Sequence, residues 1–180
     1  MSTDAGKFAA NASLKEVFQQ SEKLFRALIE NSSDAIALVS PDGIFTYISP
    51  SVTKILGFRP EELLGRNTLN LFPPDQLATA LEKFETVAKT PGLTVTVEHT
   101  CIHKDGSIRW LETTVTNHLD DPDIQAFVAN FHNITERKQA EETERFLAEV
   151  SKVLTSSLDY KTTLSNIAQL VVPQLADWFI

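Results

Sequence analysis

The sequence predicts an α+β fold in which a five-stranded antiparallel sheet carries its helices mostly on one face. Two short strand-like runs come first, a stretch with helical punctuation follows, and three longer strand-like runs come after it. Tight turns separate the strands within each group, so neighbouring strands are expected to pair antiparallel. Strands and helices that occur in separate blocks are typical of the α+β class.

The N-terminal part predicts an amphipathic helix and then a β-hairpin. Apolar side chains recur at helical spacing from residue 12 to Glu30. They are Leu14, Val17, Phe18, Leu24, Phe25 and Leu28. Two apolar runs follow, Ala35–Val39 and Ile44–Ile48, and the turn Pro41-Asp42-Gly43 joins them. These turn residues favour a tight connection between paired strands.

The segment between the two groups of strands predicts three helices. Ser49-Pro50 opens a helix that ends at Gly57, and Pro60–Gly65 repeats this punctuation, with Pro in the first turn and Gly after the last. Residues 74–89 predict a longer helix. Its apolar side chains lie three or four residues apart, at Leu77, Leu81, Phe84 and Val87.

Three longer strands are predicted at residues 93–102, 107–119 and 124–133, where β-branched side chains are frequent. The turns Lys104–Ser107 and Asp120–Asp123 separate them.

The C-terminal segment becomes rich in charged residues and predicts a helix that pairs with a second helix. We expect Asn133 to cap this helix and Glu136 to reach back toward the cap. Leu147, Val150 and Leu154 are three and four residues apart, which makes a short heptad-like seam.

Several short blocks of the sequence occur in the order and at the spacing of a known family. They are Leu24–Ile36, Asp42-Gly43, Tyr47–Ser51, Leu56–Phe58, Glu61–Gly65, His103–Trp110 and Asn133–Lys138. On these blocks the chain resembles the PAS sensor-domain family from residue 22 to residue 138, including its PAC-type C-terminal motif. Residues 158–180 resemble the opening helix of a GAF domain, a common neighbour of PAS domains in bacterial signalling proteins.

The resemblance predicts four parts. Residues 1–21 form an N-terminal tail and flanking helix, and 22–138 form the PAS domain. A coiled-coil-like linker helix spans 139–157, and 158–180 begin a GAF-like domain that is cut short. We therefore expect a fragment of a longer signalling protein.

The resemblance implies a sensory or regulatory module that passes the state of a ligand or partner through its C-terminal helix to an output domain. A histidine kinase is the expected output, with a diguanylate cyclase or a serine phosphatase as alternatives. The candidates for transmission are Asn133, Thr135 and Glu136. The family usually has Asp where this chain has Asn133, so the charged pair that this Asp often makes with an Arg is lost here. A ligand-free dimerisation or docking scaffold is the alternative function.

The resemblance also implies a ligand pocket between the inner sheet face and the short helices. The candidate pocket residues are Val97, Cys101, Leu111, Phe127, Phe131 and Thr68. Side chains of these types either line a cavity or simply fill the core, and both alternatives stay open.

Flavin and haem are disfavoured as cofactors. Flavin photoreceptors of the LOV subfamily have a Cys directly after the Gly-Arg-Asn that occurs here as Gly65-Arg66-Asn67, and this chain has Thr68 instead. The positions that hold the flavin ring with amides are expected at Cys101, Leu111 and Phe131, which would leave its polar edge unpaired. Haem-binding relatives take a His from the long helix, and residues 74–89 contain none.

Metal binding is disfavoured as well. His99, Cys101 and His103 alternate on a predicted strand, so they share a face and offer atoms that suit zinc. An extended strand, however, spaces His99 and His103 about 13 Å apart, at roughly 3.3 Å per residue.

We expect no catalytic residue in this fragment. The glycines lie at turns or helix ends, and none occurs in a phosphate-loop or nucleophile-elbow pattern.

The composition excludes some classes of binding partner and indicates the cellular compartment. The net charge is −8 and no basic cluster is present, which argues against nucleic acid and against contact with an anionic membrane. A single cysteine fits a reducing compartment, and we expect a cytoplasmic location.

We also expect a homodimer. Its candidate interface residues are Phe18, Phe25, Trp110, Leu147, Val150 and Leu154.

Overall fold

The computed structural model describes residues 19–156, with side chains described from 19 to 152. The chain divides into two compact units between Ile134 and Thr135. The first unit contains the sheet with its short helices, and the second contains a single described helix, α5 (Thr135–Ser156).

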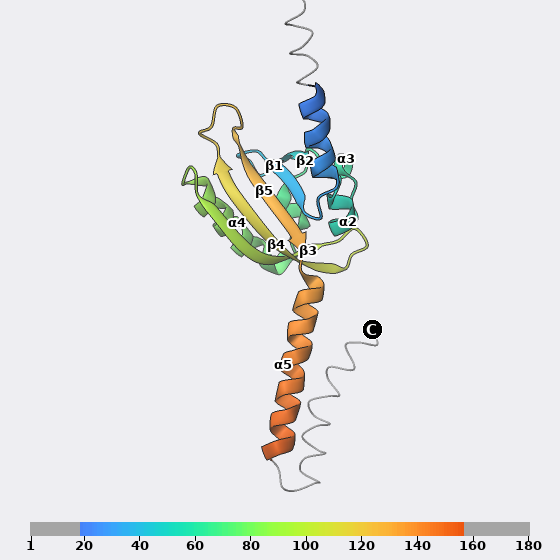
Figure 1. Cartoon of the computed structure of the whole chain (residues 1–180). Coiled ribbons are helices and arrows are strands. Elements are labelled where there is room, and N and C mark those ends of the chain that lie inside the picture. Colours follow the sequence, from blue (N-terminus) through green and yellow to red (C-terminus); the bar gives the residue numbers. More distant parts are fainter. Residues whose placement is uncertain (1–18, 157–180) are drawn as a thin grey trace, which may run out of the picture. The chain divides into compact units, whose positions relative to one another are not determined.

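The first unit is built on one five-stranded antiparallel sheet, as the sequence predicts (Figure 1). Its strands are β1 (Ala35–Val39), β2 (Phe45–Ile48), β3 (Thr94–Ile102), β4 (Ile108–His118) and β5 (Ala126–Asn133). Their order across the sheet is β2-β1-β5-β4-β3. The N-terminal hairpin therefore lies on one side of β5 and the C-terminal hairpin on the other, while β3 is an edge strand.

Short helices cover one face of this sheet (Figure 1). They are α2 (Val52–Leu56), α3 (Pro60–Leu63), the 3₁₀ turns η1 (Thr68–Leu71) and η2 (Pro74–Gln76), and α4 (Leu77–Ala88). The predicted long helix at 74–89 is thus split into a 3₁₀ turn and α4. A 3₁₀ turn at the start of an α-helix is common, because the first backbone N–H groups have no partner within the helix.

The core lies between the helices and the inner face of the sheet. In β1 the buried residues alternate with half-buried ones, so Ala35, Ala37 and Val39 face inward. Across the ladder they pair with Phe131, Ala129 and Phe127 of β5, which are buried on the same face. The buried side chains of α2 and α3 close the core from the other side.

Gly57 ends α2 in the left-handed conformation, with φ of +74°. Its backbone N–H donates to the carbonyl of Thr53, which completes the last turn. A Cβ atom at this position would lie 2.6 Å from Nε2 of His103. Backbone conformation and the close approach of the β3–β4 turn both require glycine here.

Sequence reasoning misplaced the start of the last strand. Ile124 was expected in the strand, but β5 begins at Ala126. The preceding turn is longer because the Asp121 carboxylate accepts from the Asp123 N–H and its carbonyl accepts from the Gln125 N–H. Gln125 consequently adopts a positive φ of 47°.

Asn67 fixes a segment for which the sequence predicted no structure. Its side-chain oxygen accepts from the Leu69 N–H and starts η1, while its amide donates to the carbonyl of Asp42 in the first hairpin turn. This contact spans 25 residues of sequence. It brings η1 and Thr68 to the inner face of the sheet.

A helix over residues 19–30 precedes β1. Its end is held by Ser51, whose hydroxyl lies 2.8 Å from the Ser32 carbonyl and 3.4 Å from that of Ile29. Leu24, Phe25 and Leu28 are exposed, whereas Ile29 is buried. Within residues 19–156, no helix combines the length and apolar character needed to cross a membrane.

Candidate ligand-binding cavity

A cavity of about 340 Å³ lies between the inner face of the sheet, α4 and η1. This volume is within the range of about 300–1,000 Å³ that is common for small-molecule sites. The inner face therefore is not completely filled by its own side chains, although Leu111, Phe127 and Phe131 also belong to the buried core.

The structure brings all six predicted pocket residues to the wall of this cavity. They are Thr68 from η1, Val97 and Cys101 from β3, Leu111 from β4, and Phe127 and Phe131 from β5. Contact of these residues with a ligand stays a prediction.

The ladder register explains why residues far apart in sequence meet here. Thr113 of β4 pairs with Val97 on one side and with Phe131 on the other. Paired residues point to the same face, so these three side chains form a row across the inner surface. All three line the cavity.

Helix α4 covers the cavity from the opposite side. Its Phe84 ring packs on Phe127 with a centroid distance of 5.0 Å and an interplanar angle of 60°. Such a tilted contact is favourable between aromatic rings. At the C-terminal end of the helix, the side-chain amide of Asn117 donates to the carbonyls of Val87 and Ala88. These contacts fix α4 over the sheet.

A partly buried polar cluster around His99 lies within the largely apolar wall. His99 Nε2 lies 2.8 Å from Thr113 Oγ1, and His99 Nδ1 lies 3.4 Å from the Thr100 carbonyl and 3.6 Å from Cys101 Sγ. The imidazole stacks on Phe72, with ring centroids 4.8 Å apart and planes at 19°. His99, Thr113, Cys101 and Phe72 all line the cavity.

Both titratable groups of this cluster are neutral at pH 7. Burial lowers the pKa of His99 below its usual value, and the nearby Lys83 ammonium lowers this pKa further. Burial raises the pKa of the Cys101 thiol to about 12. Since the thiolate is the reactive form, this cysteine is a poor nucleophile and metal ligand.

The cavity meets solvent between α4 and the edge strand β3. Thr79 and Lys83 of α4 and Glu98 of β3 line the cavity and are also exposed, so they mark its mouth. Near this opening the Gln76 side-chain carbonyl lies 3.4 Å from the Thr100 N–H, a long hydrogen bond that bridges η2 and β3.

Several of these residues were not among the predicted pocket residues. His99 was considered only as a metal ligand, and Thr113, Gln76 and Lys83 were missed. Thr113 could have been found, because it lies two residues after Leu111 on the same strand and therefore on the same face. Gln76 and Lys83 depend on where α4 lies in space, and no local sequence pattern reports that.

Among the described residues, no group of three or more His, Cys, Asp or Glu side chains is arranged to hold a metal ion. His99 and His103 lie in different environments and contact different residues. His103 lies at the β3–β4 turn, where its Nδ1 is 2.8 Å from Asp105 Oδ1 and its ring faces Gly57.

An ion pair links α3 to the β3–β4 hairpin. The Lys104 ammonium lies 2.7 and 2.8 Å from the two carboxylate oxygens of Glu62. This contact, and the hydrogen bond that Glu62 accepts from the Arg59 N–H, lower the Glu62 pKa to about 2. Because the pair is exposed, it contributes little to the free energy of unfolding.

The connection between the last strand, β5, and helix α5 is a single residue. Asn133 is the last residue of β5 and pairs with Leu111, and α5 begins at Thr135. The helix thus starts one residue later than a cap at Asn133 predicts. Ile134 lies between them, is buried, and donates its N–H to the Trp110 carbonyl at 2.9 Å. Thr135 and Glu136 belong to the first turn of α5.

The predicted dimer residues lie in three places. Phe25 is 65% exposed on the helix 19–30, Trp110 is 36% exposed on β4, and Leu147 is 57% exposed on α5. Val150 is half-buried. Phe18 and the side chain of Leu154 lie outside the described residues.

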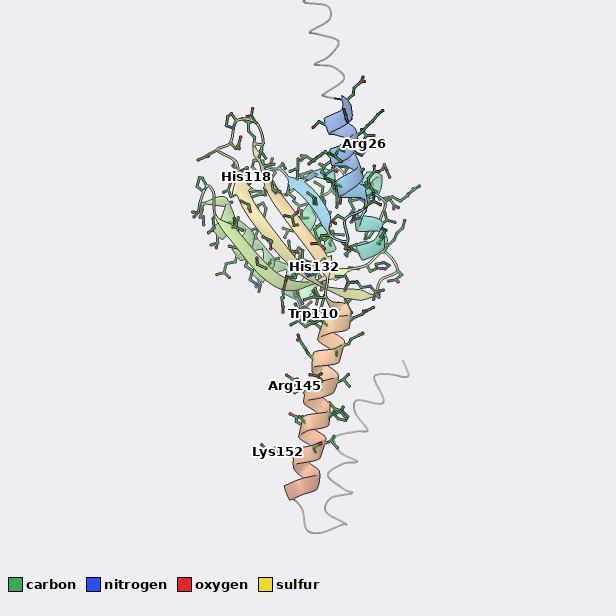
Figure 2. The ribbon with its side chains drawn as sticks, viewed as in Figure 1. Arg26, Trp110, His118, His132, Arg145 and Lys152 are labelled. Atoms are coloured by element: carbon green, nitrogen blue, oxygen red, sulfur yellow. The ribbon has the colours of Figure 1, made fainter. Side chains whose placement is uncertain are left out.

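Figure 2 shows Trp110 and His132 toward one end of the sheet and His118 toward the other.

Comparison with known proteins identifies the family. Residues 23–134 match the family model described as the PAS fold. The chain therefore belongs to the PAS family. Two solved structures support the same fold. The PAS domain of an HTR-like protein from Haloarcula marismortui has a TM-score of 0.57 and 21% identity, covering 68% of this chain and 99% of that one. A PAS domain from Colwellia psychrerythraea has a TM-score of 0.56 and 20% identity, covering 67% and 98%.

Two curated relatives are signalling proteins. The sensor histidine kinase TmoS of Ectopseudomonas mendocina is 27% identical over 142 residues, which are 75% of this chain and 14% of the relative. The probable diguanylate cyclase DgcE of Escherichia coli is 27% identical over 144 residues, 79% of this chain and 13% of the relative. The chain thus spans only about one seventh of the length of these relatives.

Proposed function

We propose that this chain is the sensory module of a larger signalling protein and that a small molecule in the cavity is its signal. One observation carries this proposal: the wall of the cavity includes β5, and a single residue separates β5 from α5. A ligand that shifts Phe131 or Leu111 acts on the same strands that meet at Asn133 and Ile134. A change there would alter the start of α5.

We propose a histidine kinase as the output, since one relative carries that name. The diguanylate cyclase among the relatives keeps that output as an alternative. In this proposal the segment 133–138 acts as the PAC-type motif, α5 acts as the linker helix, and residues 158–180 begin a GAF-like domain. A cytoplasmic location stays a prediction. The module regulates, and we assign no catalytic step to it.

The proposed mechanism requires a dimer. Two α5 helices in parallel, paired through Leu147, Val150 and Leu154, would change register or crossing angle when the cavity is filled. The exposed Phe25 and Trp110 would contribute further contacts. The alternative function is a ligand-free scaffold that uses these same surfaces only for dimerisation or docking.

Hydrogen exchange tests the coupling without knowledge of the ligand. Ala80 is a half-buried cavity residue of α4, while Ala78 is an exposed residue of the same helix outside the cavity wall. The Ala80→Leu variant fills part of the cavity and Ala78→Leu is the matched control. We expect Ala80→Leu alone to change amide exchange at Ile134 and in the first turn of α5. Equal exchange in the two variants would favour the scaffold.

A further inference from the structure

The Thr113 hydroxyl lies in the central row of the sheet that lines the cavity, and its hydrogen-bonding role is set by its neighbour His99. We propose that the cavity binds small neutral phenols, whose hydroxyl donates to Thr113 Oγ1 while the ring lies against the aromatic wall. This inference rests on the proposed function, in which the cavity binds the signal. It adds the chemical class of the ligand.

The position of the proton on His99 follows from its contacts. Nδ1 lies 3.4 Å from the Thr100 carbonyl, which can only accept a hydrogen bond, and 3.6 Å from the Cys101 thiol, which is only a weak donor. We therefore assign the proton of the neutral ring to Nδ1, which leaves Nε2 as an acceptor. The Thr113 hydroxyl, 2.8 Å from Nε2, must then be the donor in that bond.

This arrangement decides what Thr113 offers to a ligand. Its only hydrogen is directed to His99, so Oγ1 presents lone pairs to the cavity. A ligand that donates a hydrogen bond completes a chain from ligand to Thr113, to His99, and to the Thr100 carbonyl. Hydrogen bonds in such a chain polarise and strengthen one another. A ligand that only accepts would meet another acceptor.

The aromatic residues of the cavity wall favour a ligand with a neutral aromatic ring. Phe72 stacks on His99 beside the hydroxyl, and Phe84 and Phe127 form a second aromatic pair in the same wall. Burial of a charged group in such surroundings is costly unless the charge is paired. Lys83 is near enough to His99 to lower the pKa of its ring, but the Lys83 side chain is exposed at the mouth, where water screens its charge. An anion is therefore disfavoured at Thr113.

Calorimetric titration of the whole chain with three probes of similar shape tests this inference. Phenol has the donor, toluene lacks it, and benzoate carries a charge. We expect phenol to bind about tenfold more tightly than toluene, since one buried hydrogen bond is at stake, and benzoate to bind most weakly. The Thr113→Val variant should lose this tenfold preference and leave toluene binding unchanged, while Thr113→Ser should keep it.

A second variant tests the role of His99 separately from folding. His99→Phe keeps a ring against Phe72 but removes the acceptor of the Thr113 hydroxyl. Thr113 can then donate to a ligand, so benzaldehyde, which only accepts, should gain affinity relative to phenol. A merely structural role of His99 would weaken both probes equally.

The outcomes separate this inference from the proposed function. If toluene binds as tightly as phenol, or if Thr113→Val leaves the preference intact, the phenol class is wrong while ligand binding in the cavity stands. If benzoate binds most tightly, the ligand is an anion held near Lys83 and the inference is overturned. If none of the probes binds, the phenol inference fails, and the Ala80→Leu exchange experiment still decides the proposed function.

Discussion

The side-chain amide of Asn117 in β4 donates a hydrogen bond to the carbonyl of Val87 in the last turn of α4, over 2.8 Å and 30 residues of sequence. The same amide donates to the Ala88 carbonyl, and its oxygen accepts from the Leu119 N–H. A buried asparagine thus adds a donor to two carbonyls at the end of the helix, of which Val87 also accepts from the Thr90 N–H at 3.3 Å. Because α4 covers the cavity, this residue holds the cover in place.

Removal of the Asn117 amide should destabilise the fold. In Asn117→Ala, the Ala88 carbonyl loses the Asn117 donor and the Val87 carbonyl keeps only the 3.3 Å bond from the Thr90 N–H. We expect the free energy of unfolding to fall by about 2 kcal/mol. Urea denaturation measures this loss. Asn130→Ala is the control, because Asn130 is exposed on β5, and it should cost under about 0.5 kcal/mol. Equal effects of the two substitutions would contradict the role given to Asn117.

The low pKa of His99 predicts a specific pH dependence of stability. The folded state resists protonation of this imidazole, whereas the unfolded state binds the proton below pH 6.5. Stability from the neutral imidazole is therefore complete above that pH and is lost as the pH falls toward the folded-state pKa. The free energy of unfolding should fall by at most about 1.4 kcal/mol for each pH unit below that value.

The measurement is the difference in unfolding free energy between the wild type and His99→Phe, taken by urea denaturation from about pH 8 to about pH 5. Taking the difference removes the contribution of the carboxylates, which titrate in both proteins. The wild type should lose stability relative to the variant as the pH falls. A difference that does not change with pH would show that His99 is not held neutral.

Substitution of two glycines with the same backbone conformation distinguishes the cost of backbone strain from the cost of a steric clash. Gly57 and Gly65 have φ of +74° and +78°, but only a Cβ at Gly57 would meet another side chain, that of His103. Gly65→Ala should cost about 1 kcal/mol, the price of the left-handed conformation. Gly57→Ala should cost roughly 1–3 kcal/mol more, because the β3–β4 turn must move. Thermal or urea unfolding that ranks the two variants equally would reject this explanation.

The proposed dimer seam on α5 is tested by introducing charge. Leu147→Lys combined with Val150→Lys places two ammonium groups in the proposed helix–helix contact, and we expect the dimer to dissociate in sedimentation velocity. Ala148→Lys, at an exposed position outside the seam, should leave the dimer intact. If the double variant sediments like the wild type, α5 does not carry the interface.

The strands and turns were predictable because their signals are local. The Asp42-Gly43 and Lys104–Ser107 turns and the apolar run Ala35–Val39 needed only neighbouring residues. The end of the Asp121 turn was not predicted, since it depends on which N–H groups bond to the Asp121 carboxylate and carbonyl, those of Asp123 and Gln125. All six predicted pocket residues line the cavity. For the five on strands, the period of two fixes which side chains share the inner face, whereas Thr68 lies in η1.

The shape of the cavity was not predictable from local patterns. Its volume depends on the distance of α4 from the sheet, which contacts such as Asn117 with Val87 determine across 30 residues. The position of η1 likewise depends on Asn67 and the carbonyl of Asp42. The contact of Gln76 with Thr100 of β3 therefore emerged only from the folded arrangement.

Native mass spectrometry of the purified chain tests the central claim, that the cavity holds a small molecule. The wild type is compared with Ala80→Leu, with the exposed Ala78→Leu as control and with a denatured sample of each. We predict a mass excess in the wild type and in Ala78→Leu that disappears on denaturation and is reduced in Ala80→Leu, after incubation with phenol if the purified protein carries no ligand. The bare polypeptide mass in all three proteins under both conditions, or an excess that Ala80→Leu retains, would contradict the account.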